Sequence, residues 1–577
     1  MSPHTAATAP TDYWDFPRLE AWARALPAAH AGWVRVEEIG RSRHGRALLL
    51  IVLGAQDGDT EARPALWVDA GTHCAEWAGM MAAVHMTERW LADLAASGAE
   101  GEAARAFFAE HTIYVAPCIS PDGYQAMHDG APYLRSTLRP PRAGEPRIGF
   151  EPRDVDGDGA VRWMRWRHPA GPFVADPEVP LNLRLRTLDD DPADAFFVCA
   201  EGEFLCPDPA VPAGDAPWIA APLLNGLDLN RNFPAAWAPF SMFGMDGGEY
   251  ALSEPESRAM VDAVAARPCI AAALTLHTYT GALLTQPYRK PSPLAEDDVE
   301  LMDALARLAV AGTGWRAIRV HPDFMYDPDK PIVGVWADTL STVFGVPGYT
   351  LEIWDPYGHC GQTVAKPAEF FKKPDAAVIR AMVARFSEAP HAVVPWRRFD
   401  HPQLGPVEIG GLDYMRTIRN PPLAELPAEC DKAFLVAERL RRALPRVQVE
   451  ARAVPVAPGL TRVEVAFENL GYLPATGLRR GETLVGCPGT SCTLTLSGEA
   501  RLVSGAPEHR LTPLDGWGAL QVGAHGLYPA LSGDRSHRAR AAWLVTGEGE
   551  ATLTFSLGRA GKGKRALSIS PTPRIPT

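Results

Sequence analysis

The sequence is poor in cysteine and lacks an apolar leader. Nine cysteines are scattered over 577 residues, an odd number that fits no framework of disulfides. This usage favours a reducing compartment. The N-terminal stretch has no basic segment followed by an apolar core, so we expect no secretion signal. Together these absences predict a cytoplasmic protein.

Long apolar runs and basic clusters are also missing. No stretch approaches the roughly 18 uninterrupted apolar residues of a membrane-spanning helix, so no such helix is expected. The formal net charge is -13, from 69 acidic and 56 basic residues. An acidic chain without a Lys/Arg-rich run is not expected to bind nucleic acid. The remaining composition is that of a globular protein, and the chain is too long for one hydrophobic core.

Strand-like and helix-like segments alternate through the first two thirds of the chain. Segments 46–55 and 64–71 are apolar and partly β-branched, as buried strands are. Segment 76–96 carries apolar residues at helical spacing. Continuous apolar strands that alternate with helices predict an α/β fold, in which a mixed β-sheet is flanked by helices on both faces.

Changes of pattern divide the chain. The α/β pattern occupies residues 1–400, and a Pro-, Asp- and Arg-rich insertion interrupts it at about 136–222. We interpret residues 401–445 as a connecting segment with a helix. Residues 446–577 contain short strands and Gly-rich turns, which predict a C-terminal all-β, sandwich-like domain.

Three polar residues stand at unusual places in this pattern. His73 and Glu76 directly follow a strand-like segment, and His277 ends another. The ordinary interpretation is a polar surface loop and a hydrogen-bonded structural histidine. Glu352 lies inside an apolar strand, where a carboxylate is costly to bury unless it is paired or functional.

The chemistry of these residue types fits together. Two histidines and a glutamate leave zinc a fourth position for water, and zinc lowers the pKa of that water and polarises a carbonyl. A second glutamate can move the proton, and an arginine can stabilise the oxyanion. Asn230 and Arg231 could grip a terminal carboxylate, since a guanidinium binds it through two hydrogen bonds. Their ordinary interpretation is a turn with a solvated arginine.

Taken together, the motifs resemble those of the zinc metallocarboxypeptidases of the carboxypeptidase A type. Gly-x-His-x-x-Glu-Trp is present as GTHCAEW, Asn-Arg-Asn within LDLNRNF, His-[Ser/Thr]-Tyr as HTY, and the strand glutamate within TLEIW. The resemblance covers roughly residues 13–390 in matching order. Because it begins near Tyr13, it implies a bacterial-like member without an inhibitory propeptide.

The resemblance implies one zinc ion per chain and a catalytic pair. The implied zinc ligands are His73, Glu76 and His277. Glu352 is similar to the family's general base, and Arg135 to its oxyanion arginine, since it follows a Pro-Asp-Gly turn at the family's distance.

The resemblance also implies substrate-binding residues. Asn230 and Arg231 correspond to the carboxylate clamp, and Tyr279 to a wall of the substrate groove. Asp338 is similar to an aspartate near the floor of the side-chain pocket. Tyr326 is the candidate for the mobile tyrosine over the bound C-terminus.

Two positions depart from the family pattern. Ala75 stands where many relatives carry an arginine that helps to hold extended substrates, which puts the usual outer subsites in doubt. Ala337 stands where a charged residue often sets specificity for basic side chains, so we expect an apolar or small side chain to be released.

A second metal site is suggested by the segment DVDGDGAVRWMR. Asp154, Asp156 and Asp158 resemble the ligands of a calcium loop, with Gly159 at its tight turn. The glutamate expected at the twelfth position is replaced by Arg165. The ordinary interpretation is an Asp/Gly-rich turn.

The leading functional prediction is a zinc-dependent metallocarboxypeptidase. It would hydrolyse C-terminal peptide bonds of substrates with a free carboxylate, through a zinc-activated water and a glutamate general base. One alternative is a zinc amidase or peptidase for unusual linkages, such as those of cell-wall peptides. Another is a non-catalytic peptide-binding module, which the retained ligands, base and clamp disfavour. The β-domain is expected to pack against the catalytic domain, with carbohydrate or partner binding at Trp517 and Tyr528 as its alternative.

Overall fold

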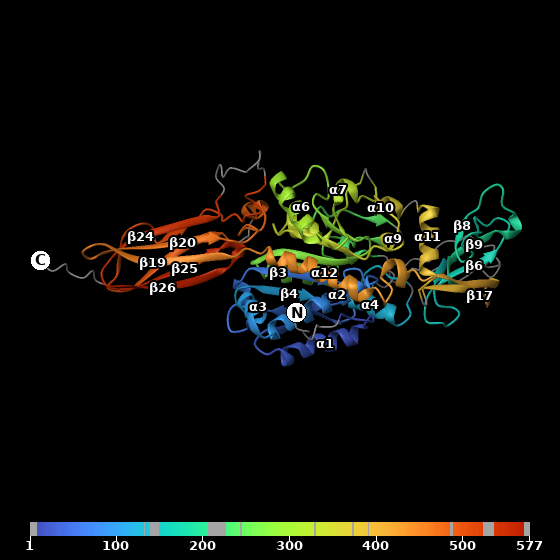
Figure 1. The fold of residues 1–577 in the computed structure, drawn as a ribbon, viewed down its shortest axis with the longest axis horizontal. Helices are drawn as coiled ribbons and strands as arrows, with labels where there is room; N and C mark the ends of the chain where they lie inside the picture. The colour runs from blue at the N-terminus through green and yellow to red at the C-terminus, as the bar shows by residue number, and fades with distance from the viewer. Residues whose placement is uncertain are drawn as a thin grey trace.

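The structure is a computed structural model of the chain. It describes residues 9–131, 133–138, 149–205, 227–242, 245–327, 330–371, 374–389, 392–484, 489–522 and 536–570. An α/β part lies in the middle of the long axis, with the insertion at one end and the C-terminal β-domain at the other (Figure 1).

The α/β part is built on one eight-stranded mixed sheet. In spatial order its strands are β1 (Val34–Arg41), β2 (Ala47–Leu53), β4 (Thr112–Ala116), β3 (Ala65–Ala70), β13 (Ile270–Thr278), β16 (Gly348–Ile353), β14 (Ala282–Thr285) and β15 (Arg316–Arg319). Strands β4, β3, β13 and β16 run parallel, and β2 and β14 join them antiparallel.

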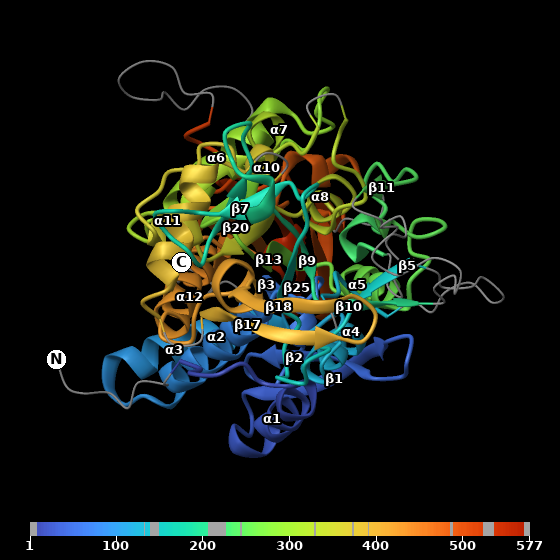
Figure 2. The same ribbon diagram turned by 90° about the vertical axis from the view of Figure 1, so that its right-hand side faces the viewer.

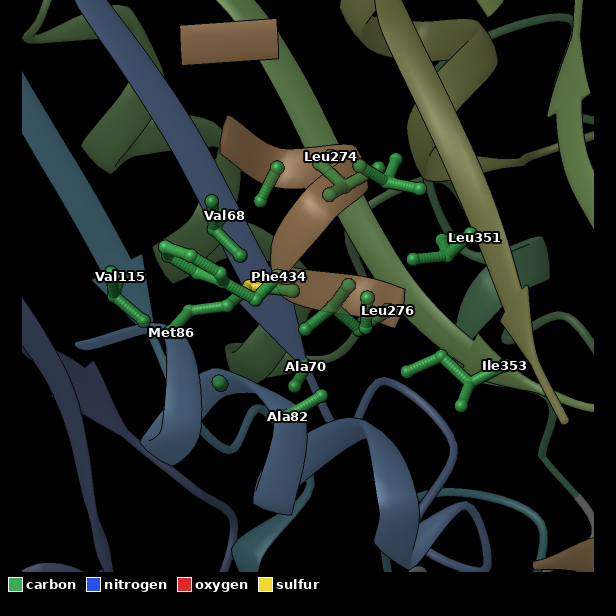
Figure 3. Packing of buried hydrophobic residues seen from close by; sticks show 14 of the residues in the cluster. Val68, Ala70, Ala82, Met86, Val115, Leu274, Leu276, Leu351, Ile353 and Phe434 are labelled. Atoms are coloured by element: carbon green, nitrogen blue, oxygen red, sulfur yellow. The ribbon is translucent and has the colours of Figure 1, made fainter. Parts of the chain in front are cut away.

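Helices cover both faces of this sheet, as the α/β prediction requires. On one face lie α1 (Phe16–Ala29), α2 (Trp77–Ala95), α6 (Glu296–Val310) and α12 (Leu426–Arg442), and on the other α5 (Pro255–Ala265) and α8 (Trp336–Thr342). Val68 of β3 packs toward the first face and Trp67 toward the second, since side chains alternate along a strand. Figure 3 shows Phe434 of α12 beside Met86 of α2 and Val68.

Shorter helices connect these elements. They are α3 (Gly98–Glu110), α4 (Pro121–His128), α7 (Val320–Asp323), α9 (Pro356–His359), α10 (Pro367–Phe370) and α11 (Ala376–Phe386). A two-stranded ladder of β11 (Ser241–Met242) and β12 (Met245–Asp246) lies near the start of α5. None of the helices in the described ranges is long and apolar enough to cross a membrane.

The parallel strands position the polar residues singled out in the sequence. His277 near the end of β13 is in register with Glu352 on β16. His73 lies in the loop that follows β3, the other neighbour of β13. The carboxyl ends of parallel strands meet at one edge of a sheet, so these three residues come together there.

A second sheet, which is antiparallel, combines strands of the insertion with two later strands. Its six strands are, in order, β17 (Val393–His401), β18 (Gly405–Leu412), β6 (Trp163–Arg167), β9 (Phe196–Ala200), β7 (Phe173–Ala175) and β8 (Leu183–Leu185). A ladder of β5 (Gly149–Pro152) and β10 (Gly202–Leu205) packs on it around Phe150, Met164 and Ile409. Seen from this end, β17 and β18 lie in front of the central strands (Figure 2).

Two strands of that sheet come from outside the insertion. Residues 393–412 were predicted to be divided between the α/β part and the connecting segment. They form β17 and β18, of which β17 pairs with β18 and β18 pairs with β6. The pairing buries Val407 and Ile409 against Met164 of β6. Strand β18 is about 240 residues from β6 in the chain, and the local sequence pattern of either strand does not indicate this pairing.

The C-terminal domain is a sandwich of two four-stranded antiparallel sheets, which confirms its prediction. One sheet contains β19 (Val447–Ala457), β20 (Leu460–Asn469), β24 (Arg538–Thr546) and β22 (Arg501–Ser504). The other contains β23 (Glu508–Arg510), β21 (Thr490–Gly498), β25 (Gly549–Leu557) and β26 (Lys562–Ile569). Inward-facing residues of both sheets, such as Phe467, Trp543 and Phe555, form its core. Trp517 is exposed and packs edge-on against Tyr472, and Tyr528 lies outside the described residues.

One buried arginine joins the sandwich to the α/β part. Arg559 donates from Nη1 to the carbonyls of Pro268 (3.0 Å) and Ile270 (2.8 Å) and from Nη2 to that of Phe344. Its Nε binds the carbonyl of Thr476 at 3.1 Å within its own domain. The guanidinium therefore satisfies carbonyl groups of both parts.

We expect Arg559→Ala to destabilise the protein by roughly 3 kcal/mol or more, because several buried acceptors lose a charged donor at once. Urea unfolding and the melting temperature measure this effect. Arg565→Ala, which removes an exposed arginine of β26, is the matched control and should change stability by less than about 0.5 kcal/mol. Equal stability of the two variants would show that the contact adds nothing to folding.

Candidate active site

Two histidines and a glutamate converge at the edge of the central sheet. His73 Nδ1 lies 3.0 Å from Glu76 Oε1, and His277 Nδ1 lies 2.8 Å from Glu76 Oε2. The two Nδ1 atoms are themselves 3.0 Å apart. All three side chains are buried.

The neighbours of the two imidazoles determine which nitrogen carries the proton. His73 Nε2 lies 3.0 Å from Asp228 Oδ1 and donates to it, which leaves a lone pair on Nδ1. Thr275 gives its hydroxyl proton to Asp69 at 2.7 Å, so its oxygen accepts from His277 Nε2 at 3.3 Å. The Nδ1 of His277 then also carries a lone pair.

Two lone pairs and a carboxylate directed at one point repel one another unless a cation lies among them. The set of two neutral imidazoles and one carboxylate, each held by a second hydrogen bond, fits zinc. Asp228 contributes to this arrangement, and the sequence analysis missed it although it lies inside LDLNRNF, two residues before Asn230.

Glu352 lies on β16 beside this centre, in register with His277. It lines the same cavity as Glu76. Burial, together with the nearby Glu76 carboxylate, raises the pKa of Glu352 to about 7. Its carboxyl group can therefore both take up and release a proton near neutrality.

Arg135 approaches the centre from the loop after α4. Its Nη1 lies 3.1 Å from Glu76 Oε1 and its Nε 3.4 Å from Asp228 Oδ2. The backbone holds it in place, because its carbonyl accepts from the amide of Cys74 at 3.0 Å. A fixed guanidinium beside the centre can stabilise negative charge that develops there.

Asn230 and Arg231 lie on a short 3₁₀ turn, where Asp228 Oδ1 accepts from the amide of Asn230 at 2.9 Å. The side-chain oxygen of Asn230 accepts from the amide of Trp336 at 2.9 Å. Arg231 donates from Nη1 to the carbonyl of Asn230 at 2.7 Å and lies over the ring of Phe240. Its buried Nε has no partner among the described residues. An unpaired buried guanidinium donor fits an anionic ligand.

Some of these residues line one cavity of about 870 Å³, whereas His73, His277 and Asn230 are not among its described lining residues. The predicted site residues that line it are Glu76, Arg135, Arg231, Tyr279, Tyr326 and Glu352. Asp338 lies apart from the described lining: its carboxylate accepts from Gln286 at 2.9 Å and pairs with Arg289.

The opposite wall of the cavity was not predicted. The insertion sheet contributes Trp163, Leu183 and Trp396, and α11 contributes Ile379 and Met382. This wall is mostly apolar. No local motif marks its residues, because their proximity to the centre depends on the pairing of β17 and β18 with the insertion.

The carboxylates of the Asp-rich loop lie within 4.8 Å of one another, an arrangement that exposed acidic groups often have without an ion. Asp154, Asp156 and Asp158 accept hydrogen bonds from backbone amides of their own loop. Arg165 lies on β6 and donates to Glu408 of β18 at 2.9 Å. The ordinary interpretation as an Asp/Gly-rich turn accounts for these contacts, and calcium is not supported.

Comparisons with known proteins cover two parts of the chain. Residues 19–171 and 201–367, more than half of the chain, match a family model described as zinc carboxypeptidase. Residues 446–568 match DUF8731, a domain of unknown function.

Individual relatives are distant. Carboxypeptidase A6 of Homo sapiens is 26% identical over 177 residues, which are 29% of this chain and 38% of that protein. Carboxypeptidase B of Astacus astacus is 27% identical over 114 residues, 20% of this chain and 34% of that protein. The chain thus spans little more than a third of the length of these relatives. The crystal structure of thrombin activatable fibrinolysis inhibitor covers 67% of this chain and 79% of its own, with a TM-score of 0.40 and 15% identity.

Proposed function

The chain belongs to the zinc carboxypeptidase family, and we propose that it hydrolyses the C-terminal peptide bond of peptides that carry a free carboxylate. The observation that carries this proposal is the content of one cavity. Glu76 of the His-Glu-His set lines it together with the ionisable Glu352 and with Arg231, whose Nε has no partner among the described residues.

Each residue has a role in this proposal. His73, Glu76 and His277 would hold one zinc ion, which lowers the pKa of water and polarises a carbonyl when it is bound. Asp228 keeps the lone pair of His73 directed at the centre. Arg231, with the side-chain amide group of Asn230, binds the terminal carboxylate and so selects the last residue of a peptide.

The proton and the developing charge are handled by two side chains. Glu352 accepts a proton from the attacking water and returns it to the leaving amine. Arg135 stabilises the oxyanion that forms at the scissile carbonyl. Because Arg135 is already oriented by Glu76 and Asp228, little reorganisation is needed during the reaction.

The released residue is proposed to have an apolar side chain. Ala337 is buried in an apolar cluster with Phe324 and Ile332, and Tyr326 packs against this cluster. The charge of Asp338 is balanced by Arg289 and is not available to a basic side chain.

The cytoplasmic localisation inferred from the sequence stays a prediction.

Removal of Arg231, the arginine proposed to bind the terminal carboxylate, tests this proposal. Arg231→Ala should lower kcat/KM on free-acid peptides by roughly 10- to 100-fold, because a charge-assisted contact to the carboxylate is lost. Arg258→Ala, which removes an exposed arginine of α5, is the control and should leave cleavage unchanged.

C-terminally amidated peptides complete the experiment. The wild type should cleave them far more slowly than free acids. In Arg231→Ala the ratio of kcat/KM between free-acid and amidated peptides should be smaller than in the wild type. Equal cleavage of amidated and free peptides by the wild type would overturn the exopeptidase proposal and favour the amidase alternative. Binding of free peptides without any turnover would favour the non-catalytic alternative.

A further inference from the structure

Arg419 reaches the candidate active site from a segment that the family model does not cover. It ends the π-helical turn Met415–Arg419, and its Nη1 lies 3.3 Å from Glu76 Oε1 and 3.2 Å from the carbonyl oxygen of Thr278. The next residue fixes this segment to the metal-binding loop: Asn420 Nδ2 donates to the carbonyl of Ala75 at 2.9 Å. The guanidinium is therefore held beside the centre.

The surroundings of Arg419 leave it capacity for a ligand. Its Nη2 binds the hydroxyls of Tyr133 (3.2 Å) and Tyr414 (3.1 Å). Its buried Nε has no hydrogen-bond partner within the described ranges. Among the described residues, Glu76 is the one carboxylate that Arg419 touches, and it is shared with two imidazoles and with Arg135. Arg419 lines the cavity, and a guanidinium whose carboxylate partner is shared in this way attracts an oxygen acceptor of a bound molecule.

The position of Arg419 relative to Arg231 and Arg135 determines which acceptor group of a bound peptide it would contact. Arg135 contacts both Asp228 and Glu76 Oε1. Asp228 directly precedes the 3₁₀ turn that carries Arg231. Arg419 approaches that same Glu76 oxygen. The three guanidinium groups thus follow one another along the cavity in the order Arg231, Arg135, Arg419.

A peptide in the proposed orientation would follow the same order. Its terminal carboxylate lies at Arg231 and its scissile carbonyl at Arg135. Its next main-chain group toward the amino end then lies at Arg419. In a longer or N-acylated peptide this group includes a carbonyl oxygen, whereas in a free dipeptide it is an α-ammonium.

We propose that Arg419 binds the carbonyl attached to the main-chain nitrogen of the penultimate residue, which is the residue that carries the scissile carbonyl. The substrates would then be N-acylated dipeptides or longer peptides rather than free dipeptides. This inference rests on the proposed function. The contact is a charge-assisted hydrogen bond to a neutral acceptor, and the guanidinium would also repel the ammonium group of a free dipeptide.

Three substrates that differ at one group test the inference. They are Phe-Phe, N-acetyl-Phe-Phe and 3-phenylpropanoyl-Phe, the last of which has neither the ammonium nor the upstream carbonyl. For the wild type, kcat/KM should be roughly 10- to 100-fold higher for the N-acetyl compound than for the 3-phenylpropanoyl compound. In Arg419→Ala this ratio should fall to near one, whatever loss of kcat/KM the three substrates share.

Arg416→Ala is the matched control, because Arg416 lies on the same turn but pairs with Asp413 and is about half exposed. It should keep the wild-type ratio. A purely structural role of Arg419, acting through Glu76, would lower zinc content and slow all three substrates by the same factor. That result, or an unchanged ratio in Arg419→Ala, would overturn the inference while the proposed function stands. Cleavage of none of the three by the wild type would overturn both.

Discussion

Glu352→Gln is expected to lower kcat by roughly 10²- to 10⁴-fold, the effect of losing a positioned general base. Glutamine has nearly the shape of glutamate and keeps its hydrogen-bonding capacity, but it cannot take up a proton. The side chain lies at the cavity wall beside His277, where the proposal requires a proton acceptor. Substrate binding should change little, so the loss should appear in kcat rather than in KM.

Turnover of a short peptide and zinc content, measured on one preparation, decide the role of Glu352. Glu388→Gln is the control, since this glutamate is on the surface, and it should behave as the wild type. Glu352→Gln with intact zinc and near-normal turnover would place the base elsewhere. A variant that unfolds or loses zinc would instead favour a structural role for this strand carboxylate.

Removal of two ligands should abolish metal binding altogether. We expect about one zinc per wild-type chain and almost none in the double variant His73→Ala, His277→Ala, because a single carboxylate remains where three donors converged. Peptidase activity should be lost with the metal. Chelation should inactivate the wild type as well, but zinc added back should restore only the wild type.

Metal analysis and melting temperature together test this prediction. His44→Ala removes an exposed histidine and should leave both quantities unchanged. The double variant should fold, since Asp228 keeps a contact to Arg135 after His73 is removed. Full zinc occupancy in the double variant would refute the assignment of the ligands.

The sequence predicted the parts of the site that local motifs encode. His73 and Glu76 are three residues apart in one loop, and His277 and Glu352 lie on apolar strands that pair in register. Buried strands that alternate with helices were enough to predict the α/β fold, whereas the edge at which these side chains meet required the pairing of the strands.

Residues brought in by distant chain segments could not be predicted. Arg419 contacts Glu76 across 343 positions, and nothing in its own neighbourhood distinguishes it from Arg416. The partner of Asp338 was equally invisible, because Arg289 reaches it from a separate loop. The departure at Ala75 was visible in the sequence. The anchoring of Asn420 to the Ala75 carbonyl, which fixes Arg419 beside the centre, required the structure.

The wall that the insertion builds opposite the metal-binding residues restricts the shape of a substrate. A chain end that reaches Glu76 would lie in a cavity that Trp163 and Trp396 line as well. An extended tail presents less bulk to such a cavity than a C-terminus packed into a helix or a sheet. The enzyme would thus distinguish polypeptides by conformation before it distinguishes them by sequence.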